Sequence, residues 1–275
     1  MDAKYRSIDW SYTKSDLFSS CPRAFYHRYV QSSSSDAPKS SEPQGSRYSE
    51  NPGSIIGTAV HDSISEQIER WKLNRHTSVE DACQQAESII QESIENFDTT
   101  DQQADLERSM AGIARKHLRN FFQNMWPQFS SHQYIVHEES ISFSVAGHTV
   151  WVRPDLCTRD SDGRFIITDW KTSDPELIKD PSEQLLVYAM WANREFEPDL
   201  DRILLQYAYT NTGEFQRSLP NQTDIEKIED QIISDCTEWN SSKTKSDFSA
   251  EPSQQKCSNC SYVPICPPGS DALRE

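Results

Sequence analysis

The chain has 275 residues, of which 35% are hydrophobic, and its formal net charge at neutral pH is -16. This length suffices for one sizeable core, or for a core with a helical annex, and we expect one catalytic unit. The sequence has no run of about 18 apolar residues, which excludes a membrane-spanning helix, and its first ten residues lack the layout of a signal peptide. We therefore expect a soluble, cytoplasmic protein.

The negative charge bears on any function that involves nucleic acids. An acidic surface repels phosphate at long range, whereas nucleic-acid enzymes usually carry a basic face. Two explanations keep a nucleic-acid substrate open: positive charge concentrated in one groove, or a host with high internal salt, where the repulsion is screened. The sequence does not decide between them.

Helices dominate the predicted first half of the chain. Residues 12 to 30 place apolar side chains at spacings of three and four, and Pro22 within them indicates a helix start or a kink. Residues 31 to 53 are rich in serine and almost free of apolar side chains, which is typical of a flexible linker. The further helices expected here cover residues 54 to 71, 78 to 97 and 102 to 124.

Strands are predicted after Pro127, where β-branched and aromatic residues alternate with short turns. The elements expected in this half are strands over 133 to 145, 148 to 158 and 164 to 171, a helix over 182 to 194, a strand over 202 to 210 and a helix over 223 to 240. Helices first, then a three-strand meander, then a helix and a strand predict an α/β fold around a small mixed sheet.

Two predicted neighbouring strands carry a set of acidic residues and a lysine. Side chains alternate along a strand, so Asp169 and Lys171 share a face while Trp170 points away, and Asp155 ends the preceding strand. Two carboxylates that meet in this way suit Mg²⁺ or Mn²⁺, and the lysine can orient a water and stabilise charge on a phosphate. Taken alone, such a tripeptide is more often a surface ion pair.

Three further polar residues indicate a function only when they are considered together with the other motifs. His61 lies near the apolar stripe of its predicted helix, where a lone histidine is usually a core residue. Gln184 and Tyr188 are four residues apart and therefore share a helix face, a spacing that carries no function of its own.

The cysteines form the strongest local pattern. Three of the seven, Cys257, Cys260 and Cys266, fall within ten residues, which fits metal ligation better than disulfides. A fourth ligand is needed, and Cys21 is the candidate. For the remaining three, Cys83, Cys157 and Cys236, buried thiols are the default expectation.

Taken together, these motifs resemble the RecB-like nucleases of the PD-(D/E)XK superfamily, in the iron-sulfur branch that includes CRISPR-associated exonucleases and the AddB nuclease domain. The resemblance covers nearly the whole chain and rests on six segments in the family's order. They are CPRAFYHRY, GTAVH, RPDL, DWK, QLLVY and CSNCSYVPIC. One departure concerns Arg153, which stands where the family usually has a glycine and adds a cation near the site.

The resemblance implies a role for each motif residue. His61, Asp155 and Asp169 would bind Mg²⁺ or Mn²⁺ together with the main-chain carbonyl of Trp170, and Lys171 would assist the attacking water. Gln184 and Tyr188 would help to position the DNA strand. The ligands implied for a [4Fe-4S] cluster are Cys21, Cys257, Cys260 and Cys266.

The resemblance also implies an architecture, namely a restriction-endonuclease-like core with an iron-sulfur clasp that joins the N- and C-terminal segments. The predicted parts are an N-terminal helix with the first cluster cysteine (1–30), the linker (31–53), a helical region with the metal-site histidine (54–126), the nuclease core (127–241) and the C-terminal cysteine segment (242–275).

The function implied is a metal-dependent DNA exonuclease that prefers single strands and acts in DNA repair and recombination or in CRISPR adaptation. No phosphate-binding loop of an ATP-driven motor is present, so a helicase, or a CRISPR integrase, would be a separate partner. Two rival readings stay open: a catalytically silent DNA-binding or scaffolding subunit with the same fold and cluster, and an interaction protein whose cysteines hold a structural Zn²⁺.

Overall fold

The computed structural model describes residues 7–31, 52–94, 103–175, 182–196, 198–242 and 244–274. By its internal contacts, the chain divides into two compact units. One comprises Met1–Ser49, Ser142–Val152 and Lys227–Glu275, and the other comprises Glu50–Ile141 and Arg153–Glu226. The segment predicted as a serine-rich linker lies almost entirely outside the described residues. No helix among those ranges is long and apolar enough to cross a membrane.

A mixed five-stranded sheet forms the centre of the second unit. Its strands, in spatial order, are β2 (Gln133–Val136), β5 (Leu156–Arg159), β6 (Phe165–Lys171), β7 (Ile203–Tyr209) and β8 (Glu214–Ser218). The β6–β7 pair is parallel and the other three pairs are antiparallel. In β6, six of the seven residues are buried, so this strand runs through the core.

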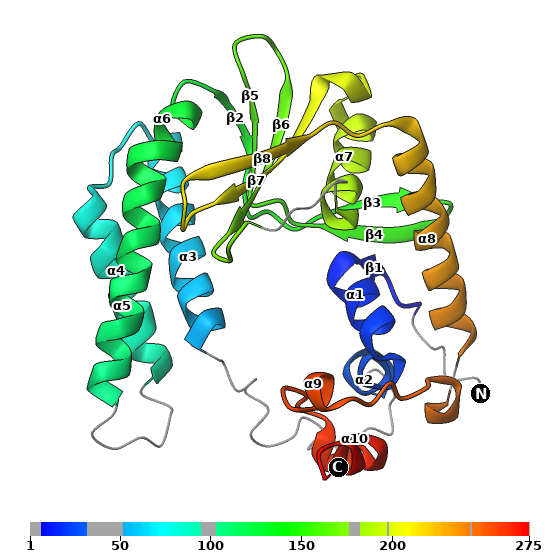
Figure 1. Cartoon of the computed structure of the whole chain (residues 1–275). Coiled ribbons are helices and arrows are strands. Elements are labelled where there is room, and N and C mark those ends of the chain that lie inside the picture. The colour runs from blue at the N-terminus through cyan, green and yellow to red at the C-terminus, as the bar shows by residue number, and fades with distance from the viewer. Residues whose placement is uncertain are drawn as a thin grey trace. The chain divides into compact units, whose positions relative to one another are not determined.

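Helices cover both faces of this sheet. The helices of the unit are α3 (Pro52–Lys72), α4 (Val79–Ile94), α5 (Gln103–Asn120), the π-helix η3 (Phe121–Met125), α6 (Trp126–Phe129), α7 (Glu183–Phe196) and the short 3-10 turn η4 (Leu200–Arg202). Trp170 of β6 packs edge-on against Phe121 and Phe129. Phe165 of the same strand packs against Trp191 and Phe196 of α7. Because side chains alternate along a strand, α7 and the other helices lie on opposite faces (Figure 1).

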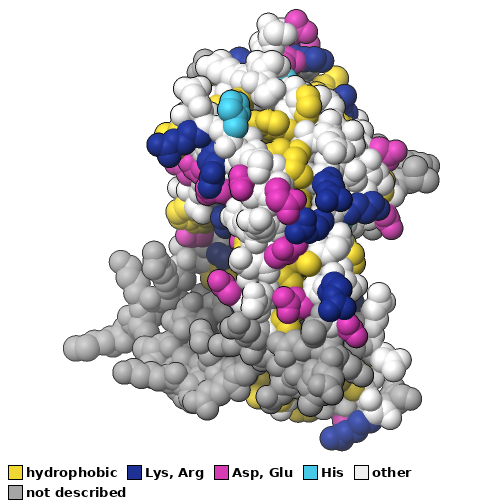
Figure 2. Space-filling model, turned by 90° about the vertical axis from the view of Figure 1, so that its left-hand side faces the viewer, with side chains coloured by type: hydrophobic (Ala, Val, Ile, Leu, Met, Phe, Trp, Pro, Cys, Tyr) yellow, Lys and Arg dark blue, Asp and Glu magenta, His cyan; other side chains and the backbone are white. Residues whose placement is uncertain are grey.

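The three long helices α3, α4 and α5 share one hydrophobic core with the sheet. Their outward face carries basic and acidic side chains intermingled, as Figure 2 shows. Arg115, for example, bonds to Glu80 and Glu87, with its Nε 2.6 Å from Glu87 Oε1. Alternating charges of this kind do not make the continuous basic band expected of a nonspecific DNA-binding face.

The first unit joins the two ends of the chain. Its elements are β1 (Trp10–Ser11), α1 (Tyr12–Ser20), α2 (Pro22–Phe25), the π-helix η1 (Tyr26–Val30), β3 (Ile141–Val145), β4 (His148–Val152), most of α8 (Gln222–Ser241), η5 (Lys245–Asp247), α9 (Gln254–Cys257), η6 (Val263–Ile265) and α10 (Pro267–Ala272). The buried Asp235 of α8 accepts hydrogen bonds from Trp10 Nε1 at 2.9 Å and from Ser15 Oγ at 2.7 Å. The N-terminal helix is therefore fixed to the C-terminal part even without a metal.

The structure confirms an α/β fold with a mixed sheet flanked by helices, but the three-strand meander was wrong. Each of the first two predicted strands is two strands that belong to different sheets: β3 and β4 pair in a three-stranded sheet of order β1-β4-β3. The first break falls at Glu138, whose backbone is left-handed with φ of 48°. The second falls at Arg153 and Pro154, where proline has no N–H to continue the strand ladder.

The N-terminal helix also departs from its prediction. Rather than one helix over residues 12 to 30, the chain breaks at Cys21, which is extended with φ of -159°, and Pro22 begins the next helix. Proline is suited to a first helical position because its missing N–H would have no partner there. The break places Cys21 between two helices.

Candidate active site and cysteine pocket

Two carboxylates meet at the end of adjacent strands. Asp155 directly precedes β5, and its Oδ2 accepts a hydrogen bond of 2.8 Å from the backbone N–H of Trp170 on β6. Asp169 precedes Trp170 and is only 3% exposed. This bond therefore fixes the carboxylate of Asp155 beside the segment that carries Asp169.

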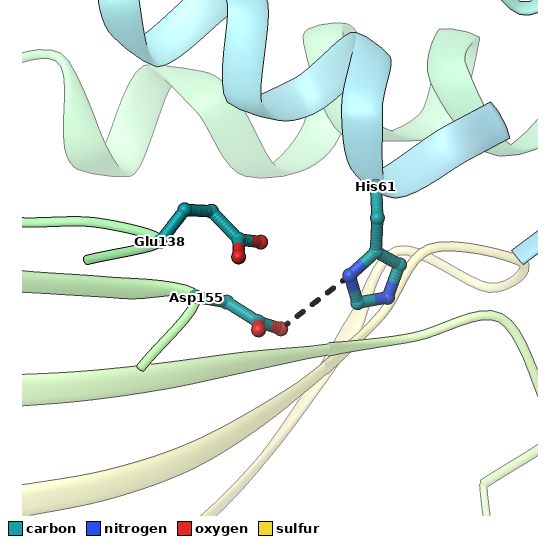
Figure 3. A group of neighbouring side chains, drawn as sticks. All are labelled: His61, Glu138 and Asp155. Atoms are coloured by element: carbon teal, nitrogen blue, oxygen red, sulfur yellow. Dashed lines mark ion pairs between the residues drawn. The ribbon is translucent and has the colours of Figure 1, made fainter. Parts of the chain in front are cut away.

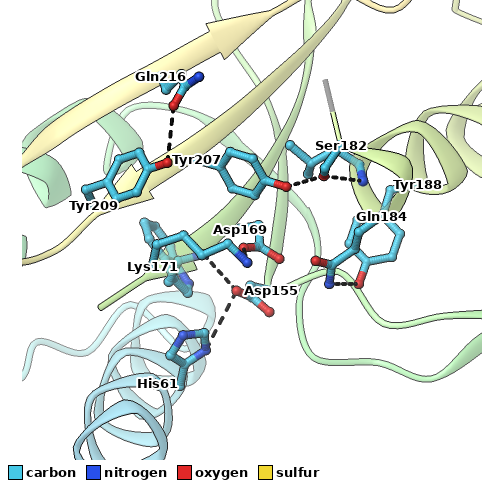
Figure 4. Close-up of polar contacts among 12 residues, drawn as sticks. His61, Asp155, Asp169, Lys171, Ser182, Gln184, Tyr188, Tyr207, Tyr209 and Gln216 are labelled. Carbon is cyan, nitrogen blue, oxygen red and sulfur yellow. Dashed lines mark hydrogen bonds and ion pairs between the residues drawn. The ribbon is translucent and has the colours of Figure 1, made fainter. Parts of the chain in front are cut away.

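Lys171 is held on the same face of β6 as Asp169. Its Nζ lies 2.7 Å from Asp169 Oδ2 and 4.9 Å from the centre of the Tyr207 ring (Figure 4). Tyr207 is paired with Asp169 in the β6–β7 ladder, and its hydroxyl donates to Ser182 Oγ. A carboxylate on one side and an aromatic face on the other thus restrict where the ammonium can lie.

His61 of α3 and Glu138, which follows β2, complete the surroundings of Asp155. His61 Nδ1 lies 3.7 Å from Asp155 Oδ2. One ligand atom from each of His61, Glu138 and Asp155 falls within 4.8 Å of the others, the only such trio found among the described residues (Figure 3). One imidazole and two carboxylates form a donor set that suits Mn²⁺ or Mg²⁺.

Burial and charge tune these groups. Burial, and next the charge of Asp169, raise the pKa of Asp155 well above its usual value. Burial likewise raises the pKa of Glu138 and lowers that of His61, so the imidazole is neutral and able to donate a lone pair at neutral pH. Burial disfavours the ammonium of Lys171, but Asp169 outweighs this effect, and the pKa of Lys171 is raised.

Gln184 and Tyr188 of α7 lie on the other side of Asp155 and contact each other. Gln184 Nε2 donates to the Tyr188 hydroxyl at 3.0 Å, and this hydroxyl donates to the carbonyl oxygen of Arg153, also at 3.0 Å. Tyr188 is only 6% exposed. The tyrosine therefore secures the backbone just before Asp155.

A separate cavity of about 160 Å³ lies in the first unit, and four of the seven cysteines line it: Cys21, Cys257, Cys260 and Cys266. The segments that carry them are bonded directly, since Lys256 Nζ donates to Ser20 O at 2.9 Å and Arg23 N donates to Ser249 O at 2.8 Å. The other three cysteines, Cys83, Cys157 and Cys236, are buried elsewhere as predicted.

The thiols of Cys257 and Cys266 lie on either side of one small space beside Gly269. At Gly269, a β-carbon would lie 3.5 Å from the sulfur atoms of both Cys257 and Cys266. His27 also lines the cavity, and its buried Nε2 has no hydrogen-bond partner among the described residues. Burial first, and then the neighbouring thiols including Cys21, raise the pKa of Cys260.

Comparison with known proteins assigns the family. The family model of the PD-(D/E)XK nuclease superfamily matches residues 9–267. The chain belongs to this superfamily. No protein of curated function matches the sequence.

Two solved structures resemble this member of the superfamily only distantly. One is a protein from Eubacterium rectale that is provisionally named an exonuclease, with 9% identity and a TM-score of 0.48, the match covering 85% of this chain and 82% of that one. The other is SSO0001, with 14% identity and a TM-score of 0.31, covering 78% of this chain and 97% of that one. The assignment rests on the family match and not on these likenesses.

PD-(D/E)XK nucleases use divalent metals, and the structure brings the predicted His61, Asp155, Asp169 and Lys171 together in one place. Glu138 was not predicted. Nothing in the sequence distinguishes it from the adjacent Glu139, because its left-handed backbone, which turns the side chain toward Asp155, has no signature in residue type.

Proposed function

We propose that the protein is a divalent-metal-dependent DNA nuclease of the RecB-like, iron-sulfur branch of its superfamily. The observation that carries this proposal is the approach of His61, Asp155 and the Asp169–Lys171 pair at the ends of two adjacent strands. Hydrolysis of a phosphodiester needs a metal site, a directed water and a cation for the developing charge. This chain has a side chain for each requirement.

The ligands of a Mg²⁺ or Mn²⁺ ion would be His61, Asp155, Asp169 and the main-chain oxygen of Trp170, with Glu138 as an additional carboxylate. Bound there, the ion supplies Lewis acidity toward the phosphate. Lys171 is charged because Asp169 raises its pKa, so it acts as a hydrogen-bond donor that orients the attacking water and stabilises negative charge on the phosphate. Gln184 and Tyr188 position the DNA strand through the backbone of Arg153.

The four cysteines of the cavity would hold a [4Fe-4S] cluster that clasps the N- and C-terminal segments. In the structure, no three of the described cysteines bring their sulfur atoms within 4.8 Å of one another. Thiolates bind both zinc and iron, so the choice of a [4Fe-4S] cluster follows the family resemblance.

The finer assignments follow the family resemblance. The substrate would be single-stranded DNA, cut from an end, in DNA repair and recombination or in CRISPR adaptation. A helicase or an integrase would be a separate partner in the cytoplasm. The domain scheme of 1–30, 31–53, 54–126, 127–241 and 242–275 belongs to the same proposal.

The test is anaerobic purification followed by digestion of end-labelled single- and double-stranded DNA with and without Mn²⁺. Release of nucleotides from single strands only when Mn²⁺ is present supports the proposal. Binding of DNA without any cleavage supports instead the silent scaffolding subunit. Iron and acid-labile sulfide near four per chain support the cluster, whereas one zinc per chain rejects it.

A further inference from the structure

Arg153 lies at the edge of the candidate active site. It directly follows β4 and precedes Pro154 and Asp155. Its Nε lies 2.9 Å from Glu138 Oε2 and donates to the Glu138 carbonyl oxygen at 3.1 Å. The carboxylate that it contacts belongs to the trio with His61 and Asp155. One end of the guanidinium is thereby fixed against a candidate metal ligand.

The outer end of Arg153 faces solvent. The side chain is 62% exposed, and among the contacts of the described residues only its Nε is used. A guanidinium has five N–H donors in a planar fork, so four of them, on the two terminal nitrogens, stay available. Its backbone is fixed as well, because the Tyr188 hydroxyl donates to its carbonyl oxygen.

An anchored fork with free terminal donors suits a planar, bidentate contact to a phosphate. The chain as a whole has a net charge of -16 and repels DNA at long range. Attraction between the protein and DNA must therefore come from local contacts such as this one. Glu138 neutralises much of the long-range field of Arg153 but does not occupy its terminal N–H groups. The contribution of Arg153 is therefore a local hydrogen-bonded clamp.

We propose that Arg153 binds a backbone phosphate of the DNA strand next to the phosphate that is cleaved. This inference rests on the proposed nuclease function and assigns a substrate-binding residue to the same site. The contact involves no base, so it adds affinity equally for all sequences.

The experiment measures binding of a fluorescein-labelled single-stranded oligonucleotide by fluorescence anisotropy, with Ca²⁺ in place of the catalytic ion, over a range of KCl concentrations. Arg153→Gln should weaken binding about tenfold, the effect of losing a hydrogen bond to a charged group. It should also reduce the slope of log K against log[salt] by about 0.7, the value for one phosphate contact on a single strand. Arg153→Lys should keep the wild-type slope with intermediate affinity.

Arg164→Gln is the matched control. Like Arg153, Arg164 uses its Nε to contact a carboxylate, in this case Asp160 Oδ2 at 2.8 Å, and its side chain is 46% exposed. Arg164 directly precedes β6, and Lys171 is the last residue of that strand. Arg164 and Lys171 therefore lie about 20 Å apart, which places Arg164 far from the candidate active site. This variant should bind DNA like the wild type, and all variants should keep the wild-type circular dichroism spectrum.

Unchanged affinity and slope in Arg153→Gln, with wild-type protein that binds DNA, would overturn the inference and leave the nuclease proposal intact. Weaker Mn²⁺ binding by calorimetry with an unchanged salt slope would also overturn it, since Arg153 would then serve only to hold Glu138. A wild-type protein that binds no DNA would overturn both proposals together.

Discussion

Lys171 Nζ lies 2.7 Å from Asp169 Oδ2, and both side chains project from the same face of strand β6. Asp169 is 3% exposed, whereas about a third of the Lys171 side chain reaches solvent. The pair thus joins a buried carboxylate, which we propose as a metal ligand, to a cation that a substrate can reach. Asp169 raises the pKa of Lys171 and so keeps the ammonium charged.

Loss of either member of this pair should abolish cleavage without loss of the fold. For Lys171→Ala we expect a fall in the single-turnover rate of roughly 10²–10³-fold, the usual effect of removing one group that stabilises transition-state charge. Asp169→Asn should be at least as severe because it removes a metal ligand. Binding of labelled DNA in Ca²⁺ should persist, and Lys116→Ala, on the exposed face of α5, serves as the control. Full activity in either variant would remove the proposed active site.

Glu138 and His61 should both contribute to metal affinity. Glu138→Gln and His61→Ala should each weaken Mn²⁺ binding to the metal-free protein by about tenfold or more, as measured by isothermal titration calorimetry. Glu139→Gln changes the adjacent, exposed carboxylate and should leave the affinity unchanged. If His61→Ala binds Mn²⁺ normally but melts at a lower temperature, His61 is a core residue.

Without metal, Asp155 should make the stability of the protein fall as the pH rises. Its pKa is raised well above 3.8, by burial and then by Asp169, so the folded protein retains a proton that the unfolded chain has already released. This stabilisation is complete below the unfolded pKa and is lost as the pH rises through the folded one. Thermal melts in chelator should therefore show the wild type losing stability relative to Asp155→Asn, whose neutral amide does not titrate, as the pH rises through this window. Parallel curves for the two proteins would contradict the prediction, and Mn²⁺ should remove the effect.

Cys21→Ser should lose iron and sulfide and melt at a much lower temperature. A cluster that links Cys21 to Cys257 closes almost the whole chain into one loop, and the chain-entropy estimate for such a closure is about 5 kcal/mol. Cleavage should fall indirectly, because phosphodiester hydrolysis needs no electron. The matched controls are the buried thiols, in the variants Cys83→Ser, Cys157→Ser and Cys236→Ser, which should keep both iron and activity. A full iron content in Cys21→Ser would place the fourth ligand elsewhere.

The parts of the fold that follow from one-dimensional periodicity were predictable. The apolar stripe of α3 and the alternation of Asp169, Trp170 and Lys171 on β6 both follow from regular geometry. The division of the strands between two sheets was not predictable from the sequence, because alternation shows which face of a strand is buried but not which sheet the strand joins. Strand β8 (Glu214–Ser218) escaped detection because it is a polar edge strand without a buried residue.

The candidate active site was likewise predictable only in part. The contact of Asp155 Oδ2 with the N–H of Trp170 joins neighbouring strands whose order the sequence indicated. The place of Glu138 depends on one left-handed residue, and that of Arg153 on the ion pair it makes with Glu138. Both are consequences of tertiary structure that residue type alone does not reveal.

The bonds from Trp10 and Ser15 to Asp235 have a consequence for biosynthesis. During translation Trp10 and Ser15 leave the ribosome 225 and 220 residues before Asp235, so they remain without this partner until α8 has been made. Helices α3 to α5 and the central sheet find their contacts within Glu50–Glu226 and can fold meanwhile. The unit that contains Cys21 can thus be completed only after Glu50–Glu226 has been made, and any iron-sulfur assembly machinery would meet all four thiols only after Cys266 has been synthesised.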